Sequence, residues 1–249
     1  MLTIAAAQPL SRSHDVAGNA GRHAEAVREA DARVVVFPEL SLTGYELAAE
    51  TLAPDDPRLE PLVRACADTG TLALAGAPVA GEHIAMLAVD GEGARVAYRK
   101  LYLGDVEAER FAPGPAPVAL DVDGVRLGLA ICKDTGVVEH AARTAALGID
   151  AYVAGVVKHD HEAPLLDERA RRIGSDHGVW VVTASMANPT GGGFERTAGL
   201  SGIWAPDGAA VARAGAEPGG IAKAQVSSRA ASAASGAPQS SSEAGAGTP

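Results

Sequence analysis

The chain has 249 residues, of which 47% are hydrophobic and only 4% aromatic, and its formal net charge at pH 7 is -10. This acidic balance, with no basic block to offset it, argues against a nucleic-acid or anionic-membrane partner. Two cysteines do not make a disulfide framework, and no apolar run is long enough for a membrane span. The first residues carry neither a basic nor a long apolar segment, so we expect no signal peptide and a cytoplasmic protein.

Hydrophobic periodicity predicts alternating strands and helices along the first hundred residues. The predicted strands cover residues 2–7, 33–37, 71–77, 84–89 and 94–98, the last two forming a hairpin around the turn at 90–93. A helix over 16–30 is capped by Asp15, and a second begins at Asp56-Pro57. Cys66 falls on the apolar face of this second helix and is interpreted as structural.

The second half continues the alternation. Strands are predicted at 125–131, 151–157, 179–185, 200–204, 209–213 and 221–226, and helices at 137–147 and 164–177. Such a mixture of strand-helix units and hairpins favours an α/β fold, a four-layer α-β-β-α sandwich with mixed sheets. We expect residues 1–226 to form this fold as a single domain. Residues 227–249 are rich in Ser, Ala, Gly and Pro, and we expect this tail to be disordered.

Cys132 lies where a strand changes into a helical pattern. Alternating apolar residues end at Ile131, and Asp134 begins the helical pattern. A cysteine so placed lies near the positive end of a helix dipole, which can lower the pKa of its thiol. A small buried hydrophobic residue is the alternative interpretation.

Glu39 directly follows an apolar strand, and Lys100 follows the predicted hairpin. Together with Cys132 they could perform one chemistry, in which a thiolate attacks a carbonyl or nitrile carbon, a carboxylate moves the proton and a cation stabilises the oxyanion. A solvated loop carboxylate or a helix cap remains the alternative for Glu39. Spacing does not establish the group, because the three residues are far apart in the sequence.

Several segments together resemble the carbon-nitrogen hydrolase (nitrilase) superfamily over nearly all of residues 1–226. The matching segments are Ala5-Ala6-Ala7-Gln8, Val34-Val35-Val36-Phe37-Pro38-Glu39, Thr43-Gly44-Tyr45, Tyr98-Arg99-Lys100, Ile131-Cys132-Lys133-Asp134, Gly199-Leu200-Ser201-Gly202-Ile203 and Pro206-Asp207-Gly208. The resemblance implies a nitrilase-like sandwich, no cofactor, and assembly as a homodimer or higher homo-oligomer.

The resemblance also implies catalytic roles. Cys132 matches the nucleophile that forms a thioester or thioimidate, and Glu39 matches the general base. Lys100 matches the cation beside the oxyanion, aided by the backbone N–H of Lys133. Many members have a second glutamate that orients the lysine and the substrate; counting back from the aromatic residue at 111 assigns it to Glu107, with Glu109 the less favoured choice.

Two lysines depart from the family pattern. Lys133 follows the cysteine where an aromatic residue is usual, and Lys158 lies in a segment that usually contains an aromatic residue. Near the site they could recognise a substrate carboxylate, and surface lysines are the alternative. Tyr45 is a further candidate for substrate binding. Asp134 fits the amidase-type Cys-aromatic-Asp pattern better than the pattern of true nitrilases.

Two other motifs are interpreted as loops. His159 and His161 are spaced as zinc ligands could be on a strand, but no third ligand is assigned, so no metal site is predicted. The glycines at 191–193 lack the strand-to-helix context of a phosphate-binding loop.

The sequence therefore predicts a thiol hydrolase that cleaves a small linear carboxamide, in the manner of omega-amidases, to a carboxylic acid and ammonia. The enzymatic alternatives are an N-carbamoyl amine or amino-acid hydrolase and a nitrilase. The alternative from another class is a catalytically silent binding protein with the same fold.

Overall fold

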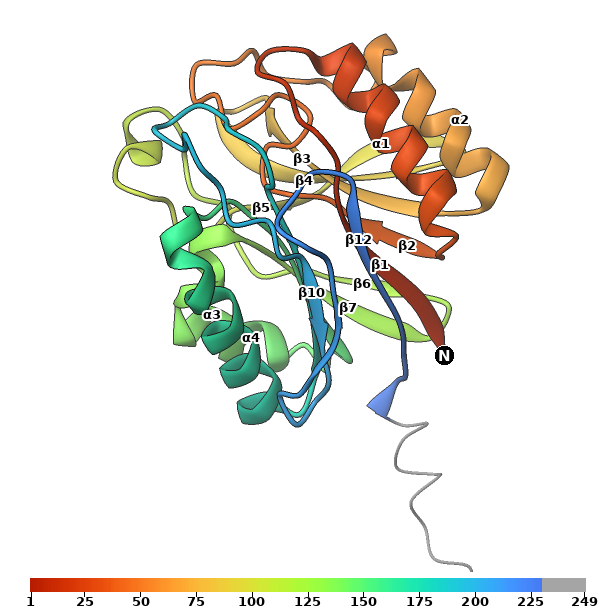
Figure 1. The fold of residues 1–249 in the computed structure, drawn as a ribbon, viewed down its shortest axis with the longest axis vertical. Coiled ribbons are helices and arrows are strands. Elements are labelled where there is room, and N and C mark those ends of the chain that lie inside the picture. Colours follow the sequence, from red (N-terminus) through yellow and green to blue (C-terminus); the bar gives the residue numbers. More distant parts are fainter. Residues whose placement is uncertain (230–249) are drawn as a thin grey trace, which may run out of the picture.

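The computed structural model describes residues 1–229, which form two six-stranded β-sheets with helices on their outer faces (Figure 1). The first sheet contains β1 (Leu2–Gln8), β2 (Val34–Val36), β3 (Leu72–Val79), β4 (His83–Asp90), β5 (Gly93–Arg99) and β12 (Gly220–Val226). The second contains β6 (Ala119–Val122), β7 (Val125–Ile131), β8 (Ala151–Val156), β9 (Trp180–Ser185), β10 (Gly202–Trp204) and β11 (Ala210–Arg213). The helices are α1 (Val16–Ala30), α2 (Glu60–Thr69), α3 (Val138–Ala145) and α4 (Ala163–His177), with 3₁₀ helices at Pro57–Leu59, Glu107–Glu109, Cys132–Gly136 and Asp160–Glu162.

Both sheets are mixed. The strand orders are β12-β1-β2-β3-β4-β5 and β11-β10-β9-β8-β7-β6, with parallel centres β1-β2-β3 and β7-β8-β9. In Figure 1, α1 and α2 cover one sheet, and α3 and α4 cover the other. The predicted four-layer sandwich is thus confirmed. Most of the predicted tail, residues 230–249, lies outside the described residues.

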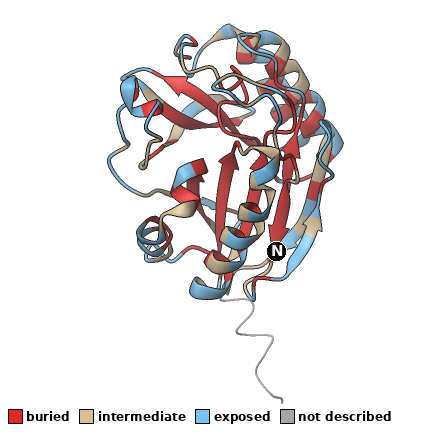
Figure 2. Cartoon of the chain, turned by 60° about the vertical axis from the view of Figure 1, so that its left-hand side comes forward, coloured by how far each residue is buried: buried red, intermediate tan, exposed pale blue. Residues whose placement is uncertain are grey.

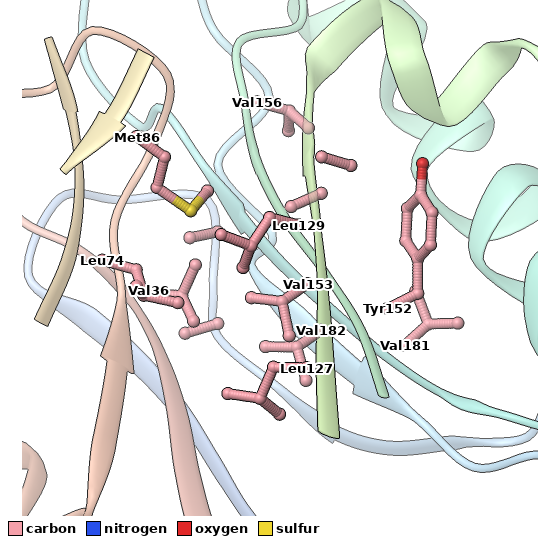
Figure 3. Close-up of a cluster of buried hydrophobic side chains, with 14 of the residues drawn as sticks. Val36, Leu74, Met86, Leu127, Leu129, Tyr152, Val153, Val156, Val181 and Val182 are labelled. Atoms are coloured by element: carbon pink, nitrogen blue, oxygen red, sulfur yellow. The ribbon is translucent and has the colours of Figure 1, made fainter. Parts of the chain in front are cut away.

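The main core lies between the two sheets. Val36, Leu74 and Met86 of the first sheet pack toward Leu129 and Val182 of the second (Figure 3). A second cluster lies between the first sheet and the helices α1 and α2. Both faces of the central strands are therefore buried, as Figure 2 shows, and burial of each large aliphatic side chain contributes roughly 1.5–3 kcal/mol.

Local sequence signals account for α1 and its boundaries. The predicted helix is confirmed over the same residues, and the Asp15 side chain accepts a hydrogen bond from the Gly18 N–H.

No helix within residues 1–229 is long and apolar enough to cross a bilayer. Indeed α1 and α4 have 15 residues each, whereas a span needs about 20.

The structure differs from the prediction on both sides of β7. The sequence prediction had no strand at β6, yet β6 pairs antiparallel with β7 through a turn at Asp123 (φ 49°) and Gly124 (φ 78°). Left-handed φ values at both positions suit a tight hairpin turn. Beyond β7, the residues from Asp134 that were expected to begin a helical pattern belong to a 3₁₀ helix, Cys132–Gly136, and α3 then covers most of the predicted helix over 137–147.

Candidate active site

The loop that carries Glu39 leaves β2 between backbones of both sheets. Gly76 of β3 lies so close that an added Cβ would be 2.3 Å from the Leu40 nitrogen. On the other side, a Cβ on Gly155 of β8 would lie 2.5 Å from the Phe37 carbonyl oxygen. Glycine at both positions permits this close approach, which brings the Glu39 loop against the second sheet.

Helix α1 holds the same loop from its outer side. The Asn19 side-chain amide donates to the Leu42 carbonyl at 3.0 Å, and a ring nitrogen of buried His23 lies 2.8 Å from the Ser41 hydroxyl. Burial lowers the pKa of His23 to about 3. The ring is therefore neutral, and it fixes the loop without adding charge beside Glu39.

Lys100 joins two carboxylates in the interior. It follows β5, is 1% exposed, and its Nζ donates to Glu39 Oε1 and to Glu107 Oε1, each at 2.6 Å. Burial alone would lower the pKa of Lys100, but the charges of Glu39, Cys132 and Glu107 outweigh burial and raise it. The ammonium is therefore charged at any working pH.

Glu107 is the most fully bonded member of the group. Besides Lys100, the Tyr45 hydroxyl donates to its Oε1 at 2.7 Å and the Gly104 N–H to its Oε2 at 2.6 Å. Burial opposes ionisation, yet Lys100 and these donors lower the pKa of Glu107. Glu109, the less favoured choice of the sequence analysis, is exposed.

Cys132 sits at a strained turn directly after β7. Its φ is 41°, in the left-handed region that non-glycine residues rarely adopt. The side chain is buried, and Sγ lies 3.3 Å from the Val157 carbonyl oxygen. Within the turn, the Thr135 hydroxyl donates to the Cys132 carbonyl at 2.7 Å. Strain of this kind persists where surrounding contacts over-determine the backbone, and it is common at functional sites.

Burial controls the protonation of the thiol and of its neighbouring carboxylate. Burial, and then the charge of Glu39, raise the pKa of Cys132 to about 12. The expectation that a helix dipole would lower this pKa is wrong, because the turn is a five-residue 3₁₀ helix and burial dominates. Burial also raises the pKa of Glu39 to about 7, although the positive charge of Lys100 acts to lower it. Its Oε2 is buried with no hydrogen-bond partner, which leaves an oxygen that can take a proton.

The two unusual lysines occupy different surroundings. The Lys133 side chain is 48% exposed, and its Nζ donates to the Leu103 carbonyl at 2.7 Å. The Lys158 side chain is only 12% exposed, and its Nζ lies 3.6 Å from Glu162 Oε1. The charge of Lys158 is among those that lower the pKa of the Cys132 thiol against burial. Lys158 therefore lies near the thiol, whereas the partners of Lys133 are Leu103 and, at 3.6 Å, Asp105.

An aromatic cluster adjoins Tyr45. The ring of Phe194 packs edge-on against Tyr45, with centroids 5.0 Å apart, and stacks on His159 at 4.3 Å. No motif in the sequence had pointed to Phe194. His161 stacks on His159 at 5.1 Å. Within residues 1–229, no group of three or more His, Cys, Asp or Glu side chains is arranged to hold a metal ion.

Comparisons with known proteins address the family and the fold. The family model described as "Carbon-nitrogen hydrolase" matches residues 3–235. A Pseudomonas protegens protein named "Hydrolase in pqqF 5'region" is 32% identical over 233 residues, which cover 86% of this chain and 79% of that protein. An (R)-stereoselective amidase from a Pseudomonas species is 27% identical over 161 residues, covering 61% of this chain and 59% of the amidase. The crystal structure of Saccharomyces cerevisiae Nit3, a member of branch 10 of the nitrilase superfamily, matches with a TM-score of 0.79 at 23% identity, covering 90% of this chain and 89% of Nit3.

Proposed function

Because the chain belongs to the carbon-nitrogen hydrolase family, we propose that it hydrolyses a small linear carboxamide, as omega-amidases do, to a carboxylic acid and ammonia. One observation carries the proposal. The buried ammonium of Lys100 bonds both Glu39 and Glu107, while the charges of Glu39 and Lys100 act on the pKa of Cys132. A thiol, a proton acceptor and a cation in one water-poor site are the groups that acyl transfer from an amide needs.

In the first half-reaction, Cys132 attacks the amide carbon and its proton passes to the free Oε2 of Glu39. With a thiol pKa of about 12 and a carboxyl pKa of about 7, the resting thiol is protonated, so proton transfer accompanies attack. The oxyanion is stabilised by Lys100 and by the backbone N–H of Lys133. The tetrahedral species then expels ammonia, which takes the proton from Glu39 and leaves a thioester on Cys132.

In the second half-reaction, water attacks the thioester carbon and gives a proton to Glu39. Collapse of this second tetrahedral species breaks the C–S bond, returns the proton to the sulfur and releases the acid. The sum is R-CO-NH2 plus water giving R-COOH plus ammonia. Glu107 accepts hydrogen bonds from Lys100 and from the Tyr45 hydroxyl, and so holds the lysine in place during both half-reactions.

Lys158 gives the reason to favour a substrate with a carboxylate at its far end. Its charge acts on the Cys132 thiol, and its Nζ lies 3.6 Å from Glu162 Oε1, longer than a hydrogen bond. We assign Lys133 a weaker part, because its side chain is already bonded to Leu103. The amidase relative supports an amide rather than a nitrile as the reacting group.

The test is ammonia release from a panel of small amides with and without a distal carboxylate, N-carbamoyl amines and nitriles, with Cys132→Ala as the control. Release from carboxylate-bearing amides, lost in the variant, is the expected result. Carbon dioxide formed together with ammonia would assign the activity to carbamoyl hydrolysis instead. No turnover of any class, with Cys132 inert toward iodoacetamide, would contradict hydrolysis and favour a binding protein.

We also propose that the chain assembles as a homodimer or a higher homo-oligomer. Sedimentation of the purified protein tests this, and a monomer at micromolar concentration would contradict it.

A further inference from the structure

Asp134 connects the segment that carries Cys132 with the segment that carries Lys100. Its Oδ2 accepts a hydrogen bond from the Ile131 N–H at 2.9 Å, immediately before Cys132. Its Oδ1 accepts one from the Tyr102 N–H at 2.9 Å, two residues after Lys100. Asp134 is fully buried. This one carboxylate therefore joins the segment that carries the thiol to the segment that carries the ammonium.

A chain of three buried side chains ends on the same carboxylate. The Tyr98 hydroxyl donates to Asp134 Oδ2 at 2.7 Å. His140 Nε2 lies 2.9 Å from the Tyr98 hydroxyl oxygen, and His140 Nδ1 lies 2.8 Å from the Tyr152 hydroxyl. These residues come from β5, α3 and β8, and Figure 3 shows Tyr152 on the side of β8 that faces the helices.

The carboxylate fixes the direction of every hydrogen bond in the chain. Because an ionised Asp134 can only accept, the Tyr98 proton points to it, and the Tyr98 oxygen is free to accept from His140. His140 therefore carries its proton on Nε2, and its bare Nδ1 accepts from Tyr152. Thr144 Oγ1 lies 3.4 Å from the same Nδ1. Burial lowers the pKa of His140, although the Asp134 charge 3.8 Å away opposes this, so the neutral ring is favoured.

We propose that His140 is a positioning residue for the reaction, acting through Tyr98 and Asp134 on the Cys132 turn. Cys132 has an unfavourable φ of 41°, and the Ile131–Asp134 bond holds the backbone at that turn. A donor at His140 Nε2 keeps the Tyr98 proton on Asp134, and Tyr98 itself precedes Lys100 by two residues. Loss of that donor leaves the Tyr98 hydroxyl oxygen unsatisfied and weakens its hold on Asp134, the carboxylate that joins the Cys132 turn to the lysine segment.

The inference rests on the proposed function, but one of its readouts does not. We would compare His140→Leu, which removes the donor, with His140→Gln, which keeps a side-chain N–H at a similar distance from the main chain. The measurements are kcat and KM for the best amide and the rate of Cys132 alkylation by iodoacetamide, with the thermal midpoint as a check of folding. For His140→Leu we expect kcat and the alkylation rate to fall about tenfold, with KM nearly unchanged, because the donor that holds the Tyr98 hydroxyl is lost.

The conservative variant decides between positioning and general packing. His140→Gln should recover most of both rates, and a glutamine variant as slow as His140→Leu would overturn the proposal. Unchanged rates in folded His140→Leu would also overturn it. If His140→Leu does not fold, Tyr98→Phe removes only a hydroxyl and should show the same losses; wild-type rates there would refute the proposal. No amide turnover, combined with His140-dependent alkylation, would refute the proposed function and leave the positioning role standing.

Discussion

Two glutamates share the ammonium of Lys100, yet their pKa values move in opposite directions. Glu107 receives three donors, from Lys100, Tyr45 and the Gly104 N–H, and its pKa is lowered. Glu39 receives one of these donors, from Lys100, and burial raises its pKa to about 7. The difference teaches that one cation does not by itself keep a buried carboxylate ionised: burial and the neighbouring Glu107 charge outweigh Lys100 at Glu39, whereas Lys100, Tyr45 and the Gly104 N–H together outweigh burial at Glu107.

This contrast suits two different tasks. A carboxylate held by three donors has little freedom to take a proton, so Glu107 fits the support of Lys100. A carboxylate with a bare buried oxygen and a pKa near neutrality can accept and return a proton during turnover. The predictions below change one side of the pair at a time.

The largest expected effect comes from Glu39→Gln, which removes the proton acceptor while keeping the shape of the side chain. Loss of a general base lowers turnover by about 10²- to 10⁴-fold. Steady-state kinetics measures this, and the alkylation rate of Cys132 should fall with it. A variant that keeps more than about a tenth of the wild-type kcat would show that Glu39 is not the base.

A smaller effect is expected from Glu107→Gln, which keeps an oxygen acceptor but removes the negative charge. In the wild type, kcat/KM should rise with pH through about 7 as Glu39 ionises. Because the Glu107 charge is one cause of the raised pKa of Glu39, its removal should lower that pKa and move the acidic limb to lower pH. A pH profile of kcat/KM for both proteins measures the shift.

The direction in which the acidic limb moves in Glu107→Gln decides the test. A limb that stays in place, or moves to higher pH, would contradict the coupling of the two carboxylates. We also expect kcat to fall about tenfold, because Lys100 loses one of its two ionic partners, a change worth about 1.4 kcal/mol.

The smallest effect is expected from Tyr45→Phe. The variant removes one of three donors to Glu107 and leaves the ring packed against Phe194. The loss of one such hydrogen bond, about 1 kcal/mol, corresponds to a roughly fivefold lower kcat. Kinetics with a long and a short amide separates this from a substrate contact: a rise in KM for only one amide would assign Tyr45 to substrate binding instead.

Local patterns in the sequence predicted most of the fold. Period-2 alternation found β7, an aspartate cap and apolar spacing found α1, and Pro206-Asp207-Gly208 marked the β10–β11 hairpin. The strand β6 was missed because Ala119–Val122 is four residues long and only half-buried, which leaves a weak alternation. Its partner β7, rather than its own composition, makes it a strand.

The candidate site was predicted in part. The family resemblance selected Glu39, Lys100, Glu107 and Cys132. The structure brings Glu39, Lys100 and Glu107 into direct contact, and the charges of Glu39 and Lys100 act on the pKa of Cys132. Local reasoning about the helix dipole gave the wrong direction for the pKa of Cys132, because burial depends on how the two sheets close over the turn.

By itself, the sequence determined the order of most strands and helices, because turns, caps and periodicity act over a few neighbouring residues, and its resemblance to a family singled out the candidate reactive side chains. Only the tertiary structure decided that Lys158 approaches the thiol while Lys133 bonds Leu103, and that His140 reaches Asp134 through Tyr98. Those contacts join residues 26 to 42 positions apart in the chain. Packing of the two sheets sets them, together with the burial that shifts each pKa.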